Sequence, residues 1–203
     1  QNNLKQMGAV FKMYAIESRS SLWPPIRSTY CNGDPVLFDQ MADLDKLFPE
    51  YLTDHEVLVC PSVMGPTDAL AWWDARPNNS PVGMAGHEET TPDGALLTGD
   101  GVVQPCEVTG AVPYSYLGWA LPESMMRLDS LIQLMTNINA LAGRWDDSTE
   151  AAREVADSDW AFEMPLNGYA RAPRIREGIE RFFVTDLNSA GATNQAQSDL
   201  AVM

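Results

Sequence analysis

Positive charge is scarce in this sequence. It carries 13 lysine and arginine residues against 28 aspartate and glutamate residues, which gives a formal net charge of −15 at pH 7. The lysines are Lys5, Lys12 and Lys46. A chain this negative repels nucleic-acid phosphates and anionic lipid headgroups. We therefore expect no nucleic-acid partner.

Residues that bind transition metals are also few. The cysteines are Cys31, Cys60 and Cys106, and none of them forms a Cys-x-x-Cys pair. The two histidines, His55 and His87, lie far apart in the sequence and have no cysteine partners at zinc-site spacing. This pattern predicts no metal site. Three cysteines allow one disulfide and one remaining thiol.

Catalytic motifs with fixed spacing are missing. The sequence has no Gly-x-Ser-x-Gly elbow, phosphate loop, Gly-x-Gly-x-x-Gly turn or His-Glu-x-x-His pair. Glycoside hydrolysis would need two carboxylates facing each other across a cleft. The nearest candidates for such a pair are Glu88, Glu89, Asp93, Asp100 and Glu107. Most carboxylates of this kind are simply solvated on the surface, so we predict a protein that is not an enzyme, with a secreted hydrolase as an alternative.

Calcium is the one cofactor for which the sequence offers candidate ligands. Asp93-Gly94 and Asp100-Gly101 place hard oxygen ligands beside flexible backbone. The sequence has no EF-hand pattern, however, and Asp-Gly pairs form turns without any ion. We therefore predict no cofactor, with calcium as the alternative.

Long apolar runs are absent as well. No stretch approaches the ~20 apolar residues of a transmembrane helix, and no signal peptide is recognisable. Because Gln1 is not a translation start, we expect that a targeting segment has been removed.

The first 21 residues have the pattern of an amphipathic helix. Leu4, Met7, Phe11 and Tyr14 recur at intervals of three or four residues. Pro24-Pro25 follows and ends the helix, because proline lacks the backbone donor that the helix needs. With 203 residues, of which 45% are hydrophobic, the chain is expected to form a single domain.

The middle of the chain reads as a strand followed by a long loop. The β-favouring run Val57–Val59 ends at Cys60-Pro61, and a loop and hairpin region extends over residues 61–106. Short strands over Ala95–Thr98 and Val102–Gln104 fit around its Asp-Gly turns. Cys60 and Cys106 bracket this loop, and a bridge between them would stabilise the fold by about 3 to 4 kcal/mol. Cys31 pairing with Cys60 is the alternative.

Trp72 and Trp73 form an aromatic pair inside that loop. Large apolar rings with a polar edge favour contact surfaces, so the pair is a candidate ligand contact for a sugar ring or a partner. In the competing interpretation, one tryptophan belongs to the core and the other covers it.

The second half combines aromatic strands with a helical insertion over residues 122–165. Strands are predicted over Val112–Trp119 and Arg181–Thr185, and a capping-box pattern at Asp147–Glu150 predicts a helix to about Asp157. A preceding helix ends at Gly143. Its expected apolar face comprises Leu128, Leu131, Ile132, Met135, Ile138 and Ala142. These elements indicate an α+β fold.

Four segments of the chain resemble bacterial prepilin-type proteins, which carry an N-terminal cleavage/methylation segment. The first is Gln1–Gly8, continued by Met13–Ala15 and Trp23–Pro25. The others are Glu56–Ser62, Ser115–Gly118 and Gly178–Asn188. Residues 122–165 match no motif of that family and read as an insertion. The His, nine residues, Asp-Gly signature with which many members end is not present.

The resemblance implies a pilin-like fold, in which the N-terminal amphipathic helix packs on an antiparallel β-sheet. Residues 1–21 would be the soluble half of a helix whose missing first half spans the membrane. The function implied is that of a structural subunit of a type IV pilus or type II secretion apparatus, exported and either inner-membrane anchored or at the cell surface. Its partners would be further copies or other pilin-like subunits, contacted through Leu4, Met7, Phe11 and Tyr14. A membrane-tethered module that binds polysaccharide or protein through Trp72 and Trp73 is the alternative.

Overall fold

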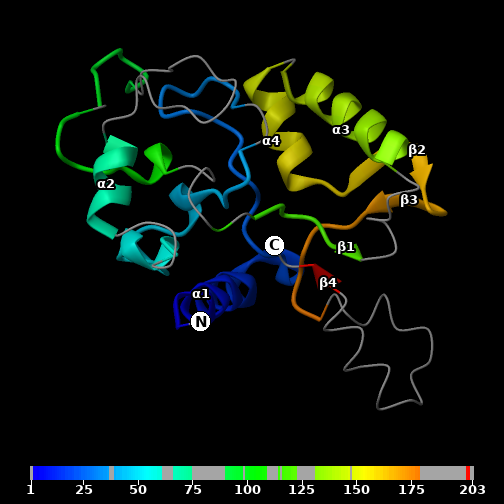
Figure 1. The fold of residues 1–203 in the computed structure, drawn as a ribbon, viewed down its shortest axis with the longest axis horizontal. Coiled ribbons are helices and arrows are strands. Elements are labelled where there is room, and N and C mark those ends of the chain that lie inside the picture. The colour runs from blue at the N-terminus through cyan, green and yellow to red at the C-terminus, as the bar shows by residue number, and fades with distance from the viewer. Residues whose placement is uncertain are drawn as a thin grey trace.

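The part of the chain that the structure describes contains four α-helices and two small antiparallel sheets (Figure 1). The computed structural model describes residues 2–36, 39–60, 66–74, 90–97, 99–108, 114, 116–122, 131–146, 148–178 and 200–201. The α-helices in this part are α1 (Asn2–Glu17), α2 (Pro66–Asp74), α3 (Leu131–Asp146) and α4 (Thr149–Asp157). The strands are β1 (Leu121–Pro122), β2 (Trp160–Leu166), β3 (Tyr169–Ala172) and β4 (Leu200–Ala201). The predicted α+β class is confirmed.

Four short 3-10 helices complete the described elements. They are η1 (Arg19–Ser21), η2 (Leu44–Lys46), η3 (His55–Leu58) and η4 (Pro105–Glu107). The described helices include none that is long and apolar enough to cross a bilayer. The late strand expected over residues 181–185 lies outside the described residues.

The described strands form two antiparallel pairs, β1 with β4 and β2 with β3. The turn between β2 and β3 is Asn167-Gly168, and both residues have positive φ, 49° and 86°. Tight hairpin turns require that conformation, and an Asn-Gly pair adopts it readily. The aromatic segment expected as a strand over Val112–Trp119 is described only in part. Within it, Trp119 forms an isolated bridge with Arg174.

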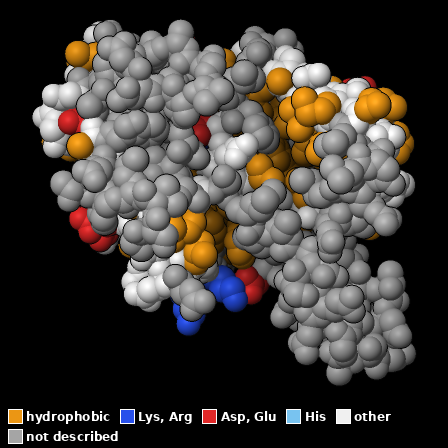
Figure 2. Space-filling view, viewed as in Figure 1, with side chains coloured by type: hydrophobic (Ala, Val, Ile, Leu, Met, Phe, Trp, Pro, Cys, Tyr) orange, Lys and Arg blue, Asp and Glu red, His pale blue; other side chains and the backbone are white. Residues whose placement is uncertain are grey.

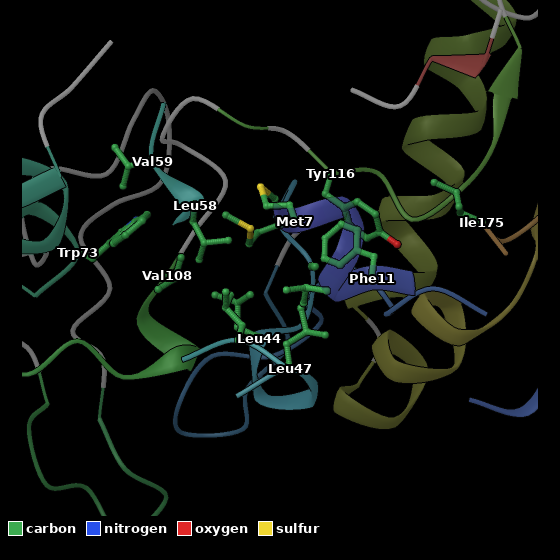
Figure 3. Close-up of a cluster of buried hydrophobic side chains, with 14 of the residues drawn as sticks. Met7, Phe11, Leu44, Leu47, Leu58, Val59, Trp73, Val108, Tyr116 and Ile175 are labelled. Atoms are coloured by element: carbon green, nitrogen blue, oxygen red, sulfur yellow. The ribbon is translucent and has the colours of Figure 1, made fainter. Parts of the chain in front are cut away.

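Helix α1 packs into the first of two buried apolar clusters. Met7 and Phe11 point into it beside Leu44, Leu47 and Leu58, as Figure 3 shows. In the described chain the main neighbours of α1 are η3 and η1. The apolar stripe of α1 packs on η3 and, through the Phe11 ring, on the rings of Trp23 (5.5 Å between centroids) and Tyr116 (5.1 Å).

The second apolar cluster lies between α3, α4 and β2. Trp119, Trp145 and Trp160 are buried in it. α3 buries Leu141 and Trp145, whereas Ile132 and Met135, two residues of the expected apolar face, are exposed. The expectation was right for Ile138, which packs against this cluster, and wrong for Ile132 and Met135. α3 carries a second apolar stripe, and the stripe containing the large Trp145 ring removes more apolar surface from water.

Two predictions for the middle of the chain were wrong. The expected strand over Val57–Val59 is largely the 3-10 helix η3, which the Asp54 carboxylate caps by accepting the Glu56 N–H (2.8 Å). The expected loop over 61–106 contains α2, which begins with Pro66. Proline suits the first position of a helix, because the N–H it lacks has no partner there.

The turn predicted at Asp93-Gly94 is present. The Thr91 N–H donates to the Ala95 carbonyl (2.8 Å), and Thr90 forms an antiparallel bridge with Leu96. No strand forms over Val102–Gln104, where the chain instead leads into η4.

The disulfide joins Cys31 to Cys106, with their Cα atoms 5.2 Å apart. Both pairings considered from the sequence, Cys60 with Cys106 and Cys31 with Cys60, were therefore wrong. η4 holds Cys106 against the turn that contains Cys31, while the Cys60 thiol makes a hydrogen bond with Tyr114 instead. Burial, and to a smaller extent this hydrogen bond, raises the pKa of Tyr114.

Candidate functional site

The segment Leu22–Pro25 connects α1 to both apolar clusters. Its four carbonyls accept hydrogen bonds, in chain order, from Ser18 Oγ (2.7 Å), Arg174 Nη2 (2.8 Å), Tyr116 Oη (2.6 Å) and the Asp43 N–H (2.8 Å). Pro24 and Pro25 have no backbone N–H, so at these two residues only the carbonyls need hydrogen-bond partners, and both have one. The orientation of α1 relative to the rest of the chain is therefore fixed by specific contacts.

Arg174 is the main cross-link of this junction. Its buried guanidinium donates to the carbonyls of Trp23, Gly118 (3.2 Å) and Ala156, and its Nη1 lies 3.4 Å from an Asp157 carboxylate oxygen. The Ala156 carbonyl lies in the last turn of α4, where carbonyls lack helical partners and a cation is favourable. One side chain thus joins the junction after α1 to the second apolar cluster.

A charge pair in which both side chains are buried lies close to the junction. Arg27 Nη1 is 3.0 Å from Asp39 Oδ2, and the two side chains are only 4% and 9% exposed. The Arg27 guanidinium also lies 5.6 Å from the centre of the Tyr30 ring, and its Nε donates to the Thr29 carbonyl. Such a pair is expensive to break, because either partner alone would be a buried charge.

The four residues predicted as an assembly face do not form one exposed surface. Met7 and Phe11 are buried in the first apolar cluster, and Tyr14 is half-buried against the Tyr51 ring, at a centroid distance of 5.7 Å. Leu4 continues the same stripe beyond the cluster and is exposed. The amphipathic pattern was identified correctly, but the fold itself uses most of that stripe.

The exposed surface of α1 lies on its opposite side. Ala9, Met13 and Ile16 face water there, with Ile16 80% exposed. Lys5 and Lys12 flank these residues, and Lys12 lies 3.6 Å from Glu177. A second set of apolar residues in the same helix was the sequence signal that could have indicated this outer face.

The candidate ligand contact is not formed as predicted. Trp73 is buried in the first apolar cluster at 1% exposure, so its ring offers no face to a ligand. This agrees with the competing interpretation, in which one tryptophan of the pair belongs to the core. The side chain of Trp72 lies outside the described residues.

The Asp-Gly pairs serve turns in this structure. The Asp93 carboxylate accepts a hydrogen bond from Thr91 Oγ1, which holds the pKa of Asp93 below its usual value. Asp100 Oδ1 accepts the Val102 N–H (2.8 Å), and the N–H groups of Gly99 and Gly101 donate to the Asp74 carboxylate. Across the described ranges, no group of three or more metal-ligating side chains converges.

The structure also describes some of the carboxylates that were considered for hydrolysis. Glu107 is buried in η4, where its Oε2 accepts the Gln104 N–H (2.7 Å) in a capping box. Glu88 and Glu89 lie outside the described residues.

Asp43 is a partly buried carboxyl at the junction. Burial, and to a smaller extent the negative charge of Asp45, raises the pKa of Asp43 from 3.8 to about 6. The folded protein therefore binds this proton more tightly than the unfolded chain does. Between pH 4 and pH 6 the contribution of Asp43 to stability falls as pH rises.

Replacing Asp43 with asparagine is expected to raise the free energy of unfolding at pH 7 by on the order of 2 kcal/mol, because the variant has no buried charge to desolvate. It should also remove the fall in stability between pH 4 and pH 6. Urea denaturation at several pH values measures both effects. The control is Glu50→Gln, an exposed carboxyl that should leave the pH profile unchanged. An Asp43→Asn profile identical to the parent profile would contradict this assignment.

No protein-family model, curated protein or solved structure matches this chain. The functional assignment therefore depends on the residues and on their geometry.

Proposed function

We propose that this protein is a pilin-like or pseudopilin-like structural subunit, whose helix α1 takes part in assembly. The observation that carries the proposal is the outer face of α1. One side of this helix packs into the domain, and the other leaves Met13 and Ile16 in water at 46% and 80% exposure. Exposed apolar side chains are unfavourable in water, and a partner that covers them removes this unfavourable free energy.

The rigid connection of α1 to the domain supports the same role. Arg174 and Tyr116 hold the Trp23-Pro24 backbone from the far side of the junction. A helix held in this way presents its outer face at a defined angle. A repeating assembly needs a constant helix orientation, because every contact between neighbouring copies has the same geometry.

The proposed location is outside the cytoplasm, anchored at the inner membrane or on the cell surface. The resemblance of residues 1–25 to prepilin-type proteins motivates this part of the proposal. The Cys31–Cys106 disulfide supports it, because disulfides persist in oxidising compartments. No observation on the described residues favours the alternative of a binding module, since Trp73 is buried.

Ile16→Glu in the full-length protein is expected to abolish assembly while leaving the domain folded. Ile16 is the most exposed apolar side chain described in α1, so the substitution costs the monomer little. In a covered interface the same carboxylate would be a buried charge. The measurement is the sedimentable fraction from source-cell surfaces, with electron microscopy, and a loss of about tenfold or more is expected.

Leu96→Glu is the matched control. Leu96 is 56% exposed on the hairpin around Asp93-Gly94, and its replacement should leave the sedimentable fraction unchanged. If the unsubstituted protein is monomeric in every cell fraction, the proposed function is wrong. If the Ile16→Glu variant assembles as well as the parent protein, α1 is not part of the contact.

A further inference from the structure

The outer side of α3 is a second exposed apolar surface. Ile132 is 78% exposed and Met135 53% exposed. No charged residue occurs from Ser130 to Gly143, although 20% of the whole chain is charged. Figure 2 shows hydrophobic side chains gathered in the region of α3. A helix face that avoids charge in such an acidic protein is suited to being covered.

The two apolar helix faces lie far apart on the molecule. Figure 1 shows α1 at the lower side of the view and α3 at the upper right. They belong to different apolar clusters, α1 to the first and α3 to the second. One copy therefore cannot bring its own α1 outer face onto its own α3.

Charge distinguishes between the possible pairings of copies. The outer side of α1 carries Lys5 and Lys12, two of the three lysines in the chain. The segment from Arg144 to Glu163, which contains the end of α3, all of α4 and the start of β2, has seven acidic residues and two arginines. Pairing α1 with α1 would bring lysines together, and pairing α3 with α3 would bring acidic segments together. Pairing α1 with α3 brings opposite charges together.

We propose that the outer face of α1 in one copy docks on the outer face of α3 in a second copy. Met13 and Ile16 would lie against Ile132 and Met135, with Lys5 and Lys12 near the acidic segment. Both helices have 16 residues, about 24 Å, so they match in length. Because the two faces differ, each added copy leaves one of each kind free, and the contact propagates from copy to copy as an open chain unless its rotation closes a ring. This inference rests on the proposed function and names its contact.

Cysteine cross-linking in the full-length protein tests the contact. The background carries Cys60→Ser, so that the native disulfide is retained and no other thiol competes. Ile16→Cys and Ile132→Cys are placed in one chain, and a short thiol-specific cross-linker is applied to cell-surface material. A ladder of dimers and larger multimers is expected. Mixing two chains with one substitution each should give dimers only.

Val102→Cys is the matched control for Ile132→Cys, because Val102 is 54% exposed and belongs to neither helix. The chain with Ile16→Cys and Val102→Cys should give no ladder. Dimers from Ile16→Cys alone, or from Ile132→Cys alone, would show a symmetric contact and overturn the proposal. A cross-link only to a different protein would overturn it as well.

Electron microscopy of the same samples separates the two proposals. If assemblies are present but the α1–α3 ladder is absent, the contact is wrong and the proposed function stands. If the protein is monomeric in these samples, both are wrong. Ile132→Arg provides an independent readout, since a buried unpaired charge should lower the assembled fraction by about tenfold or more.

Discussion

Replacing Arg174 with methionine is expected to lower the free energy of unfolding by about 3 to 5 kcal/mol. Methionine fills much of the same volume but donates no hydrogen bond. The carbonyls of Trp23, Gly118 and Ala156 would each lose a donor in a buried site. A buried carbonyl that loses its partner costs its full desolvation penalty, which applies to Trp23 and Ala156, whereas the Gly118 carbonyl still accepts the Ile175 N–H (3.0 Å).

Urea denaturation followed by tryptophan fluorescence measures this loss. Trp119 lies beside the Arg174 site and Trp160 packs against it at a ring-centroid distance of 5.7 Å, so the signal reports local packing. Arg171→Met is the matched control, because the Arg171 side chain is 70% exposed and forms a solvated pair with Asp159. The control should change stability by no more than about 0.5 kcal/mol. Equal losses from both variants would show that Arg174 is not the cross-link described.

The elements that could be predicted from the sequence are those whose signals are local. The stripe of α1 contains Met7 and Phe11, and the structure buries both. The capping pattern predicted α4, and Ser148 accepts the Ala151 N–H as its cap, one residue after the expected position. These signals act within one or two turns of chain, so distant contacts do not override them.

Predictions failed where distant contacts decide between local alternatives. Val57–Val59 is too short for its pattern to distinguish a strand from a buried turn. α3 has two apolar stripes, and only the position of β2 selects the one with Trp145. The cysteine pairing depends on how the chain brings η4 to the turn at Cys31, which spacing alone does not reveal.

The sequence also contains a local signal for a hairpin that the predicted elements do not include. Asn167-Gly168 follows the segment Trp160–Leu166, and an Asn-Gly pair after such a segment is a strong indication of a hairpin. It would have predicted β2 and β3. The outer face of α1 is a similar case, because Met13 and Ile16 are apolar residues of the same helix that lie off its main stripe.

Removing the disulfide by the double substitution Cys31→Ala and Cys106→Ala is expected to lower the free energy of unfolding by about 4 kcal/mol. The bridge closes a loop with a sequence separation of 75, so its loss gives the unfolded chain much more freedom. It also frees the turn at Cys31 from η4. Urea denaturation of the oxidised parent and the double variant measures the difference, and reduction of the parent should reproduce it.

Cys60→Ala is the control that separates this pairing from those considered from the sequence. Cys60 is outside the disulfide and hydrogen bonds with Tyr114, so its replacement should cost only about 1 kcal/mol. The parent and Cys60→Ala should then show the same loss of stability on reduction. If Cys60→Ala instead abolished the effect of reduction, Cys60 would be a member of the bridge.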